Sequence, residues 1–262
     1  MMLGQIGSIA CSKPFAVDMM ARQRILCFYQ WRRHCAGHAL VLHQFNSISE
    51  EVSMLTLYFS PGACSLASHI GLEETGAPYE TKPILLAKQQ QRTESYLKIN
   101  PRGKVPALDA DGKILVENTA ILTYLARRFP EKKLMPADPV DEARCIGTMC
   151  WFSSIVHPSY QRANRPERFA EDQGAHDAVK ENGRKSFWAN CQEIDSMFQG
   201  NDWIMGNEYT LVDPYALVFY GWGVRGGFPM KDLKAYTAWQ ERMMQRPTVR
   251  KTVESEQKVS TS

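Results

Sequence analysis

The order of expected strands and helices between residues 54 and 130 constrains the fold of this chain more than any other feature. Leu55, Leu57 and Phe59 alternate with Thr56 and Tyr58, which predicts a short strand. The patterns that follow predict a helix at 65–75, a strand at 79–86, a helical turn at 95–99, a hairpin over 105–116 and a helix at 119–129. This β-α-β-α-β-β-α order within so short a span predicts one mixed sheet with helices packed on it.

The second half of the chain carries helical patterns. Residues 141–156 and 171–198 show helical periodicity without strand alternation. Five of the six tryptophans lie in this half, where such large rings commonly fill cores. The predicted fold class is therefore α+β followed by all-α, with a sheet domain at 54–130, a linker rich in Pro, Lys and Asp at 131–138, a helical domain at 139–253 and a tail at 254–262.

Residues 1–53 differ from the rest because they show no steady helical or strand period. They are poor in acids and contain several arginines, which is typical of an organelle transit peptide. The preferred interpretation is that translation begins at Met54, so that 1–53 is a non-native or disordered extension. Its cysteines and histidines fit no common zinc spacing, so no metal site is predicted from Cys27, His34, Cys35, His38 and His43.

Composition argues against several classes of protein. The net charge of +3 is small for a nucleic-acid-binding protein, and the basic residues do not cluster. The seven cysteines are odd in number and irregularly spaced, which favours a reducing, intracellular compartment over a disulfide framework. No apolar run of about 18 residues occurs in the sequence. We therefore expect a cytoplasmic protein with no membrane span and no nucleic-acid partner.

Cys64 is the first candidate for chemistry, because it stands where the first strand hands over to the helix at 65–75. A helix N-terminus offers free N–H groups and a partial positive charge, and both favour a thiolate, either that of Cys64 or that of a bound thiol. The alternative interpretation is a small, half-buried residue in a turn. The pattern alone does not choose between them.

Two further motifs lie near predicted element ends. Val105-Pro106 precedes a strand, and a cis peptide there would turn the Val105 backbone outward toward a peptide-like ligand. Glu117-Asn118 precedes the helix at 119–129, where open N–H groups can hold a ligand with an ammonium and a carboxylate; a plain helix cap is the alternative. A third motif, Thr210 to Asp213, fits a structural capping box.

Four segments in order resemble the soluble glutathione S-transferases, most closely the bacterial, cysteine-containing beta class. They are SPGACSLASHI at 60–70, INPRGKVPAL at 99–108, LVENTAILTYLA at 115–126 and GNEYTLVDPYAL at 206–217. The resemblance covers residues 54–253 and leaves 1–53 out. Asn118 stands where the family commonly has Ser, and Pro214 replaces the usual small residue in the capping motif.

The resemblance implies a thioredoxin-like domain at 54–130 that binds glutathione and an all-helical domain at 139–253 that forms much of the second-substrate pocket. Family members are usually homodimers. The implied glutathione-binding set is Val105 before a cis Pro106 at the cysteinyl part, Glu117 and Asn118 at the γ-glutamyl end, and Lys88 and Lys104, with Lys88 or Gln89 near the glycyl end. The implied catalytic set is Cys64 near the glutathione sulfur, Ser65 as a thiolate-stabilising hydroxyl, and His157 from the helical domain.

The predicted function is conjugation of the glutathione thiolate, a co-substrate rather than a metal cofactor, to small hydrophobic electrophiles in detoxification or catabolism. One alternative is a glutathione-dependent thiol-disulfide reductase with Cys64 as nucleophile. Another is a non-catalytic glutathione-binding protein. The electrophile is not readable from the sequence; candidates for the lining of its pocket are Tyr160, Arg162, Arg165, Trp222 and Arg225.

Overall fold

The computed structural model describes residues 54–261, so the prediction for 1–53 lies outside the described residues. A four-stranded sheet has the order β2-β1-β3-β4. Strand β1 pairs parallel with β2 and antiparallel with β3, and β3 pairs antiparallel with β4. The strands are β1 (Leu55–Phe59), β2 (Tyr79–Pro83), β3 (Ala107–Ala110) and β4 (Lys113–Val116). This mixed sheet confirms the predicted thioredoxin-like architecture.

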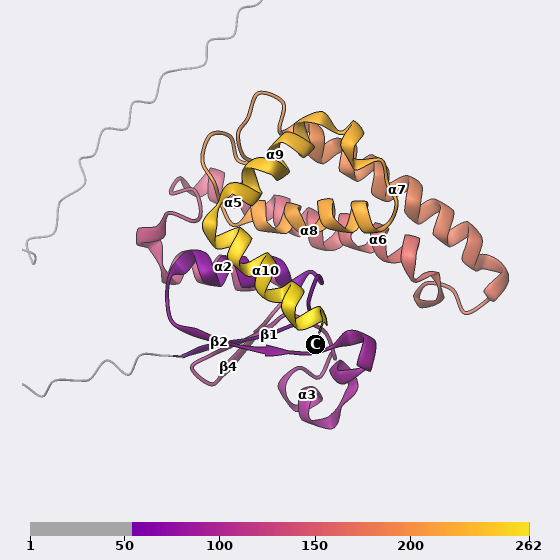
Figure 1. Ribbon diagram of the computed structural model, residues 1–262, viewed down its shortest axis with the longest axis horizontal. Helices are drawn as coiled ribbons and strands as arrows, with labels where there is room; N and C mark the ends of the chain where they lie inside the picture. The colour runs from indigo at the N-terminus through magenta and orange to yellow at the C-terminus, as the bar shows by residue number, and fades with distance from the viewer. Residues whose placement is uncertain (1–53, 262) are drawn as a thin grey trace, which may run out of the picture. The chain divides into compact units, whose positions relative to one another are not determined.

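Helices cover both faces of the sheet, which explains why β1 is buried along its whole length. On one face Leu55, Leu57 and Phe59 pack against α2 (Ser65–Thr75) and α4 (Asn118–Arg128). On the other face Tyr58 packs with Tyr96 of α3 (Glu94–Ile99). Figure 1 shows α2 and α3 on opposite sides of the strands. The alternating residues of β1 therefore supply two separate cores.

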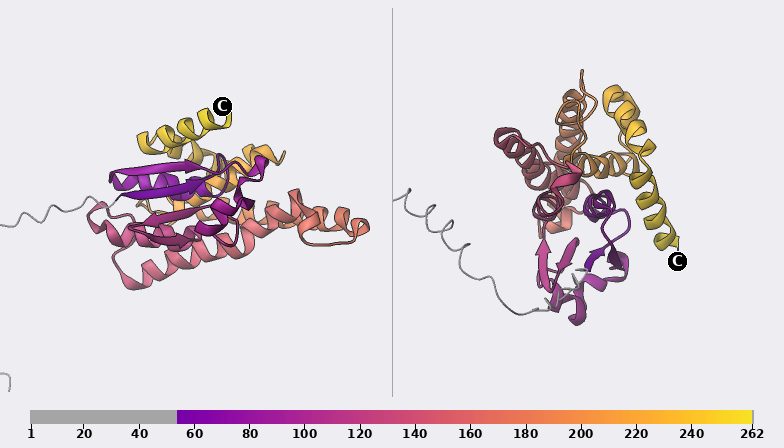
Figure 2. Two further views of the ribbon diagram at one scale, coloured as in Figure 1. Left: turned by 90° about the horizontal axis from the view of Figure 1, so that it is seen from below. Right: turned by 90° about the vertical axis from the view of Figure 1, so that its left-hand side faces the viewer.

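The rest of the described chain is helical, as predicted. Helix α5 (Pro139–Trp151) continues through a π-helical turn (Phe152–Val156) into α6 (His157–Asn164), and α7 (His176–Met197) packs alongside α6. Figure 2 shows these helices gathered on the α2 side of the sheet. No helix within residues 54–261 is long and apolar enough to cross a membrane. The remaining helices are α8 (Val212–Arg225), α9 (Lys234–Gln245) and α10 (Pro247–Thr261).

The predicted tail at 254–262 is wrong for its described part, because α10 continues to Thr261. This helix packs against α2, in agreement with Figures 1 and 2. Its inner face carries Val249, Thr252 and Glu256, each no more than 3% exposed. The sequence pattern misses this helix because two of its three buried positions are polar.

Asp213 anchors the start of α8, which carries Tyr215 and Trp222. Its carboxylate accepts hydrogen bonds from the backbone N–H groups of Ile204 and Thr210, at 3.1 and 2.9 Å. It also accepts from the Trp239 indole at 3.2 Å and the Thr210 hydroxyl at 3.4 Å. The motif is structural, as predicted, but the Thr210 hydroxyl donates to Asp213 rather than accepting from a helix N–H.

Helices α6 and α7 approach closely at Gly183, and we expect Gly183→Ala to destabilise the fold. A Cβ there would lie 2.4 Å from the Ala163 nitrogen, a backbone atom that cannot rotate away. We expect a loss of about 2 kcal/mol in the free energy of unfolding, measured by urea denaturation. The matched control is Gly147→Ala on α5, where a Cβ meets nothing within 4 Å, so stability should rise by up to about 1 kcal/mol. Equal effects of the two substitutions would contradict this packing.

Candidate active site

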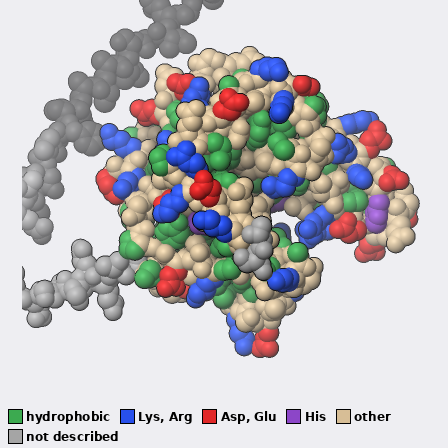
Figure 3. Space-filling view, in the orientation of Figure 1, with side chains coloured by type: hydrophobic (Ala, Val, Ile, Leu, Met, Phe, Trp, Pro, Cys, Tyr) green, Lys and Arg blue, Asp and Glu red, His purple; other side chains and the backbone are tan. Residues whose placement is uncertain are grey.

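A cavity of about 620 Å³ lies between the sheet-bearing part and the helices α6 and α8. Figure 3 shows the surface hollowed between these parts, with Lys and Arg side chains beside the hollow. Seven of the nine predicted site residues line this cavity: Cys64, Lys104, Val105, Pro106, Glu117, Asn118 and His157. Segments separated by almost a hundred residues in sequence therefore meet here.

Cys64 occupies the N-cap position of α2, as the sequence predicts. Its thiol donates a hydrogen bond to the Val105 carbonyl oxygen over 3.4 Å. Burial raises the pKa of the Cys64 thiol to about 12, and the nearby N–H groups of the helix start lower it by less. Of the two thiolates that the helix N-terminus could favour, the raised pKa disfavours that of Cys64, and the thiolate of a bound thiol stays a prediction. Cys64 is a neutral hydrogen-bond donor.

The peptide bond between Val105 and Pro106 is cis, as the resemblance implies. The preceding carbonyl, that of Lys104, accepts hydrogen bonds from the Tyr96 hydroxyl at 2.6 Å and the Asn100 amide at 2.8 Å. These two contacts hold the loop against α3. Val105 thereby lines the cavity with a carbonyl whose present partner is the Cys64 thiol, a weak donor that a peptide-like ligand can replace.

Glu117 and Asn118 differ in what they offer to a ligand. Glu117 has a positive φ of 72°, and its exposed carboxylate pairs with Arg102 at 3.2 Å. The Asn118 side chain is buried, and both of its polar atoms are hydrogen-bonded. Its oxygen accepts from the Ser68 hydroxyl at 2.6 Å, and its nitrogen donates to the Cys64 carbonyl at 2.9 Å. Asn118 thus ties α4 to α2, and what it offers the cavity is the backbone at the start of α4.

Two predicted site residues do not line the cavity. The Ser65 hydroxyl is fully buried and donates to the Ser60 carbonyl at 3.1 Å while accepting from the Ser60 N–H at 3.0 Å. It closes the turn before α2 and does not face a ligand. Lys88 ends a helical turn whose first residue, Leu86, lines the cavity, but Lys88 itself does not. Gln91 and Arg92, three and four residues further on, line the cavity instead.

His157 begins α6 and lines the cavity from the helical side. Its ring packs edge-on against Trp222 with centroids 4.8 Å apart, and its Nε2 lies 3.2 Å from the Gln161 amide nitrogen. Burial, with Lys104 and Arg168 nearby, lowers the His157 pKa to about 4. The imidazole is therefore neutral at neutral pH and accepts a proton only in acid.

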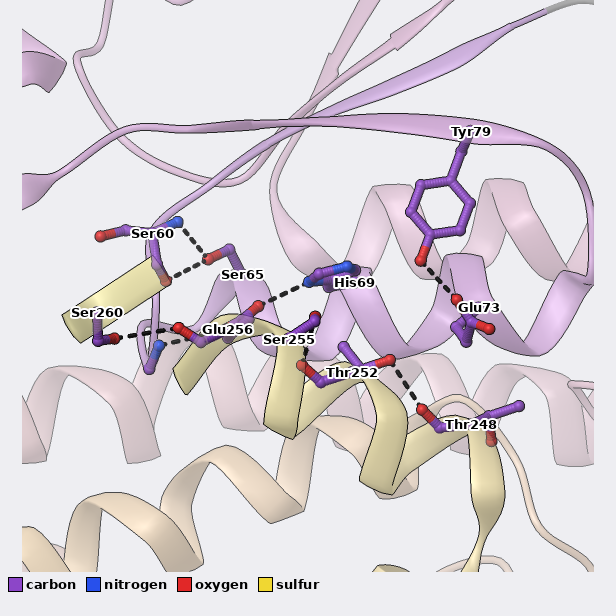
Figure 4. A network of polar contacts seen from close by, with 11 residues as sticks. Ser60, Ser65, His69, Glu73, Tyr79, Thr248, Thr252, Ser255, Glu256 and Ser260 are labelled. Carbon is purple, nitrogen blue, oxygen red and sulfur yellow. Dashed lines mark hydrogen bonds and ion pairs between the residues drawn. The ribbon is translucent and has the colours of Figure 1, made fainter. Parts of the chain in front are cut away.

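The turn before Cys64 is held from the helical part of the chain. The Gly62 N–H donates to Glu256 of α10 at 2.9 Å. The same carboxylate lies 2.9 Å from Nδ1 of His69 on α2, a contact drawn in Figure 4. The Gly62 carbonyl accepts from Trp222 at 3.0 Å and from Arg225 at 2.8 Å. Sequence reasoning missed Glu256 because its partners lie far away along the chain.

Of the residues proposed for the electrophile pocket, Arg165 and Trp222 line the cavity. Arg168 and Phe169 line it as well and were missed. Both follow α6 in a short turn that shows no helical or strand periodicity. Their nearness to Arg165 along the chain is the sequence feature that could have indicated them.

Comparison with known proteins adds a family to this geometry. Residues 53–127 match the model described as glutathione S-transferase, N-terminal domain. The glutathione S-transferase GstA of Escherichia coli O157:H7 is 29% identical over 77% of this chain and 98% of its own length. A Sulfitobacter glutathione transferase homologue, solved with bound glutathione, is 30% identical with a TM-score of 0.74 over 78% of this chain and 98% of that one. The beta class enzyme of Sphingomonas chungbukensis is 32% identical with a TM-score of 0.68 over 77% and 98%.

The raised pKa of Cys64 predicts how this thiol reacts with iodoacetamide. Because the thiolate is the reacting form, the alkylation rate should rise about tenfold per pH unit from pH 7 to 10, without the plateau near pH 8.5 of an ordinary cysteine. The rate at Cys64 is followed by mass spectrometry of the peptide that contains it, with the exposed Cys150 as internal reference. A plateau below pH 9 at Cys64 would show that the helix start outweighs burial.

Removing the Glu256 carboxylate should weaken the fold strongly. Glu256→Ala leaves the Gly62 N–H and the buried His69 without their partner, and we expect a loss of about 3 kcal/mol in the free energy of unfolding. The matched control is Glu254→Ala on the exposed face of α10, with a change within about 0.5 kcal/mol. Urea denaturation measures both variants. Equal stabilities would mean that the Gly62 turn does not depend on α10.

Proposed function

Because this chain belongs to the glutathione S-transferase family, we propose that it conjugates the thiolate of glutathione to small electrophiles. The observation that carries the proposal is the meeting of three groups on one cavity: the cis Val105-Pro106 peptide, the start of α4 at Glu117, and Cys64 at the start of α2. The Val105 backbone can pair with a peptide-like ligand, and the start of α4 at Glu117 can bind charged ends. The N–H groups at the start of α2 can stabilise a thiolate, and glutathione has a group for each of these contacts.

In the proposed complex the Val105 backbone pairs with the cysteinyl part of glutathione. The γ-glutamyl end lies at Glu117 and the N–H of Asn118, where a carboxylate finds the positive end of α4 and an ammonium finds the Glu117 side chain. The glycyl carboxylate lies toward Lys104 and Arg92. Arg92 replaces Lys88 in this role because Lys88 is outside the cavity.

The proposed chemical step is attack by the glutathione thiolate. A C–S bond forms at the electrophilic carbon, and the electron pair of the broken bond departs with the leaving group. The thiol proton goes to solvent before the attack. Backbone N–H groups at the start of α2 stabilise the thiolate, and the neutral Cys64 thiol can donate a hydrogen bond to it without like-charge repulsion. Ser65 contributes through its backbone, because its hydroxyl is committed to Ser60.

A glutathione-dependent disulfide reductase would need Cys64 as a thiolate nucleophile. The raised pKa of its thiol disfavours that chemistry in this structure. Ala67 also stands where a resolving cysteine would stand in a dithiol motif. Conjugation is therefore the better supported function. By analogy with the family we further propose a cytoplasmic homodimer that acts in detoxification or catabolism.

Replacing Cys64 by Ala separates the two activities. Conjugation of 1-chloro-2,4-dinitrobenzene should keep kcat/KM within about tenfold, since one neutral hydrogen-bond donor is lost, and reduction of the glutathione mixed disulfide of 2-mercaptoethanol should fall to background. Cys150→Ala, an exposed cysteine outside the cavity, is the control and should change neither activity. Loss of conjugation by more than a thousandfold would identify Cys64 as a nucleophile. Failure of the native protein to bind immobilised glutathione would overturn the proposed function itself.

A further inference from the structure

The lining of the cavity carries more positive charge than glutathione requires. Its charged residues are one acid, Glu117, and the five bases Arg92, Arg102, Lys104, Arg165 and Arg168. Glu117 pairs with Arg102, so these two charges offset one another. Four cations then remain around one cavity.

None of those four cations forms an ion pair with an acid in the part of the chain that the structure describes. Arg92 comes from the sheet-bearing part, and Arg165 and Arg168 come from the turn after α6. Among Arg92, Arg165 and Arg168 the described structure gives one side-chain hydrogen bond, from Arg168 to the neutral Gln161 oxygen at 3.3 Å. Burial lowers the Arg168 pKa most, the charges of Arg165 and Arg92 lower it further, and the Glu167 charge raises it in part. Like charges held close together are stabilised when an anion binds between them.

Glutathione accounts for part of this charge only. With its thiol ionised, the tripeptide carries three negative groups and one ammonium, a net charge of about −2. Its glycyl carboxylate takes Arg92 or Lys104 in the proposed complex, and its thiolate lies at the start of α2, away from the turn after α6. Arg165 and Arg168 therefore remain on the side of the cavity that faces the second substrate.

Apolar surface adjoins the two arginines. Phe169 follows Arg168 and is 46% exposed, and the rings of Tyr215 and Trp222 line the same cavity. Resting on the proposed function, we propose that the second substrate is an anionic electrophile: an apolar, ring-sized body that bears a carboxylate, with Arg165 and Arg168 binding the carboxylate. The body packs against Phe169 and Trp222, and its reacting carbon points toward the glutathione sulfur.

The inference is tested with a matched pair of chloroarenes, 4-chloro-3,5-dinitrobenzoate and its methyl ester. In both, the sulfur displaces chloride, which leaves with the electron pair of the C–Cl bond. The readout is the ratio of kcat/KM for the benzoate to kcat/KM for the ester, each divided by its uncatalysed rate constant. We expect this ratio to be about ten in the native protein. It should fall at least tenfold in the Arg165→Met, Arg168→Met double variant.

The controls separate an anion site from a general effect of charge. Arg250→Met removes an exposed arginine of α10 that is outside the cavity and should leave the ratio unchanged. The Arg165→Lys, Arg168→Lys variant keeps both charges and should recover part of the ratio.

If the arginines serve glutathione instead, the double Met variant loses activity on both substrates equally, the ratio stays constant, and the inference is overturned. A native ratio of one or less also overturns it, and both results leave conjugation intact. In this assay the proposed function is contradicted if the native protein conjugates neither substrate.

Discussion

The peptide group of Gly62 is the point on which the candidate site depends. Its N–H is bonded to Glu256 of α10, and its carbonyl is bonded to Trp222 and Arg225 of α8. Gly62 itself has a φ of 66°, which lets the chain reverse between β1 and α2 at little steric cost. Cys64 stands two residues further on. Its position is therefore determined by helices that follow it by more than 150 residues in sequence, and the site forms only when both parts of the chain are folded together.

The inner and outer parts of the cavity differ in charge. The inner part, or floor, carries Cys64 and His157, and the outer part, or rim, carries Arg165 and Arg168. At the floor Cys64 and His157 are both neutral, because burial favours their uncharged forms; the Glu117 charge raises the Cys64 pKa further, and the Lys104 and Arg168 charges lower the His157 pKa further. At the rim Arg165 and Arg168 are exposed and keep their charges in contact with water. A ligand anion is attracted to the rim at little cost, whereas a thiolate at the floor needs the N–H groups at the start of α2. The N–H groups and the arginines thus serve different anions.

The fold and most of the site follow from local patterns in the sequence. The strand at β1, the helix starts at Cys64 and Asn118 and the Val105-Pro106 turn depend on near neighbours, so periodicity and motifs locate them. What could not be predicted depends on distant contacts. The Ser65 hydroxyl bonds to Ser60, and the Asn118 amide bonds to Ser68 and to the Cys64 carbonyl, because buried polar groups need partners that only the folded chain supplies.

The last helix and the Cys64 thiol show the same limit. In the sequence, residues 254–261 have the pattern of a polar tail. In the fold, α2 covers Glu256, and the buried carboxylate is stabilised by the Gly62 N–H and by His69. The Cys64 thiol shows that a helix start does not by itself decide ionisation. Its favourable N–H groups are visible in the sequence, but the larger cost of burial depends on packing from Val105 and Tyr215, which only the folded chain provides.

The two halves of the cavity also recognise ligands by different means. The sheet-bearing half presents backbone groups of Val105 and Asn118 beside charged side chains such as Glu117, and its backbone groups are insensitive to most substitutions provided the loops keep their shape. The helical half presents the side chains of the turn Pro166–Arg168 and its neighbours, which belong to no strand and lie outside the packed core. Close packing of α6 on α7 at Gly183 holds the two helices on either side of the segment 165–175 that contains this turn. Under the proposed function, selectivity for the electrophile can therefore vary through these side chains while the chemistry at the start of α2 stays the same.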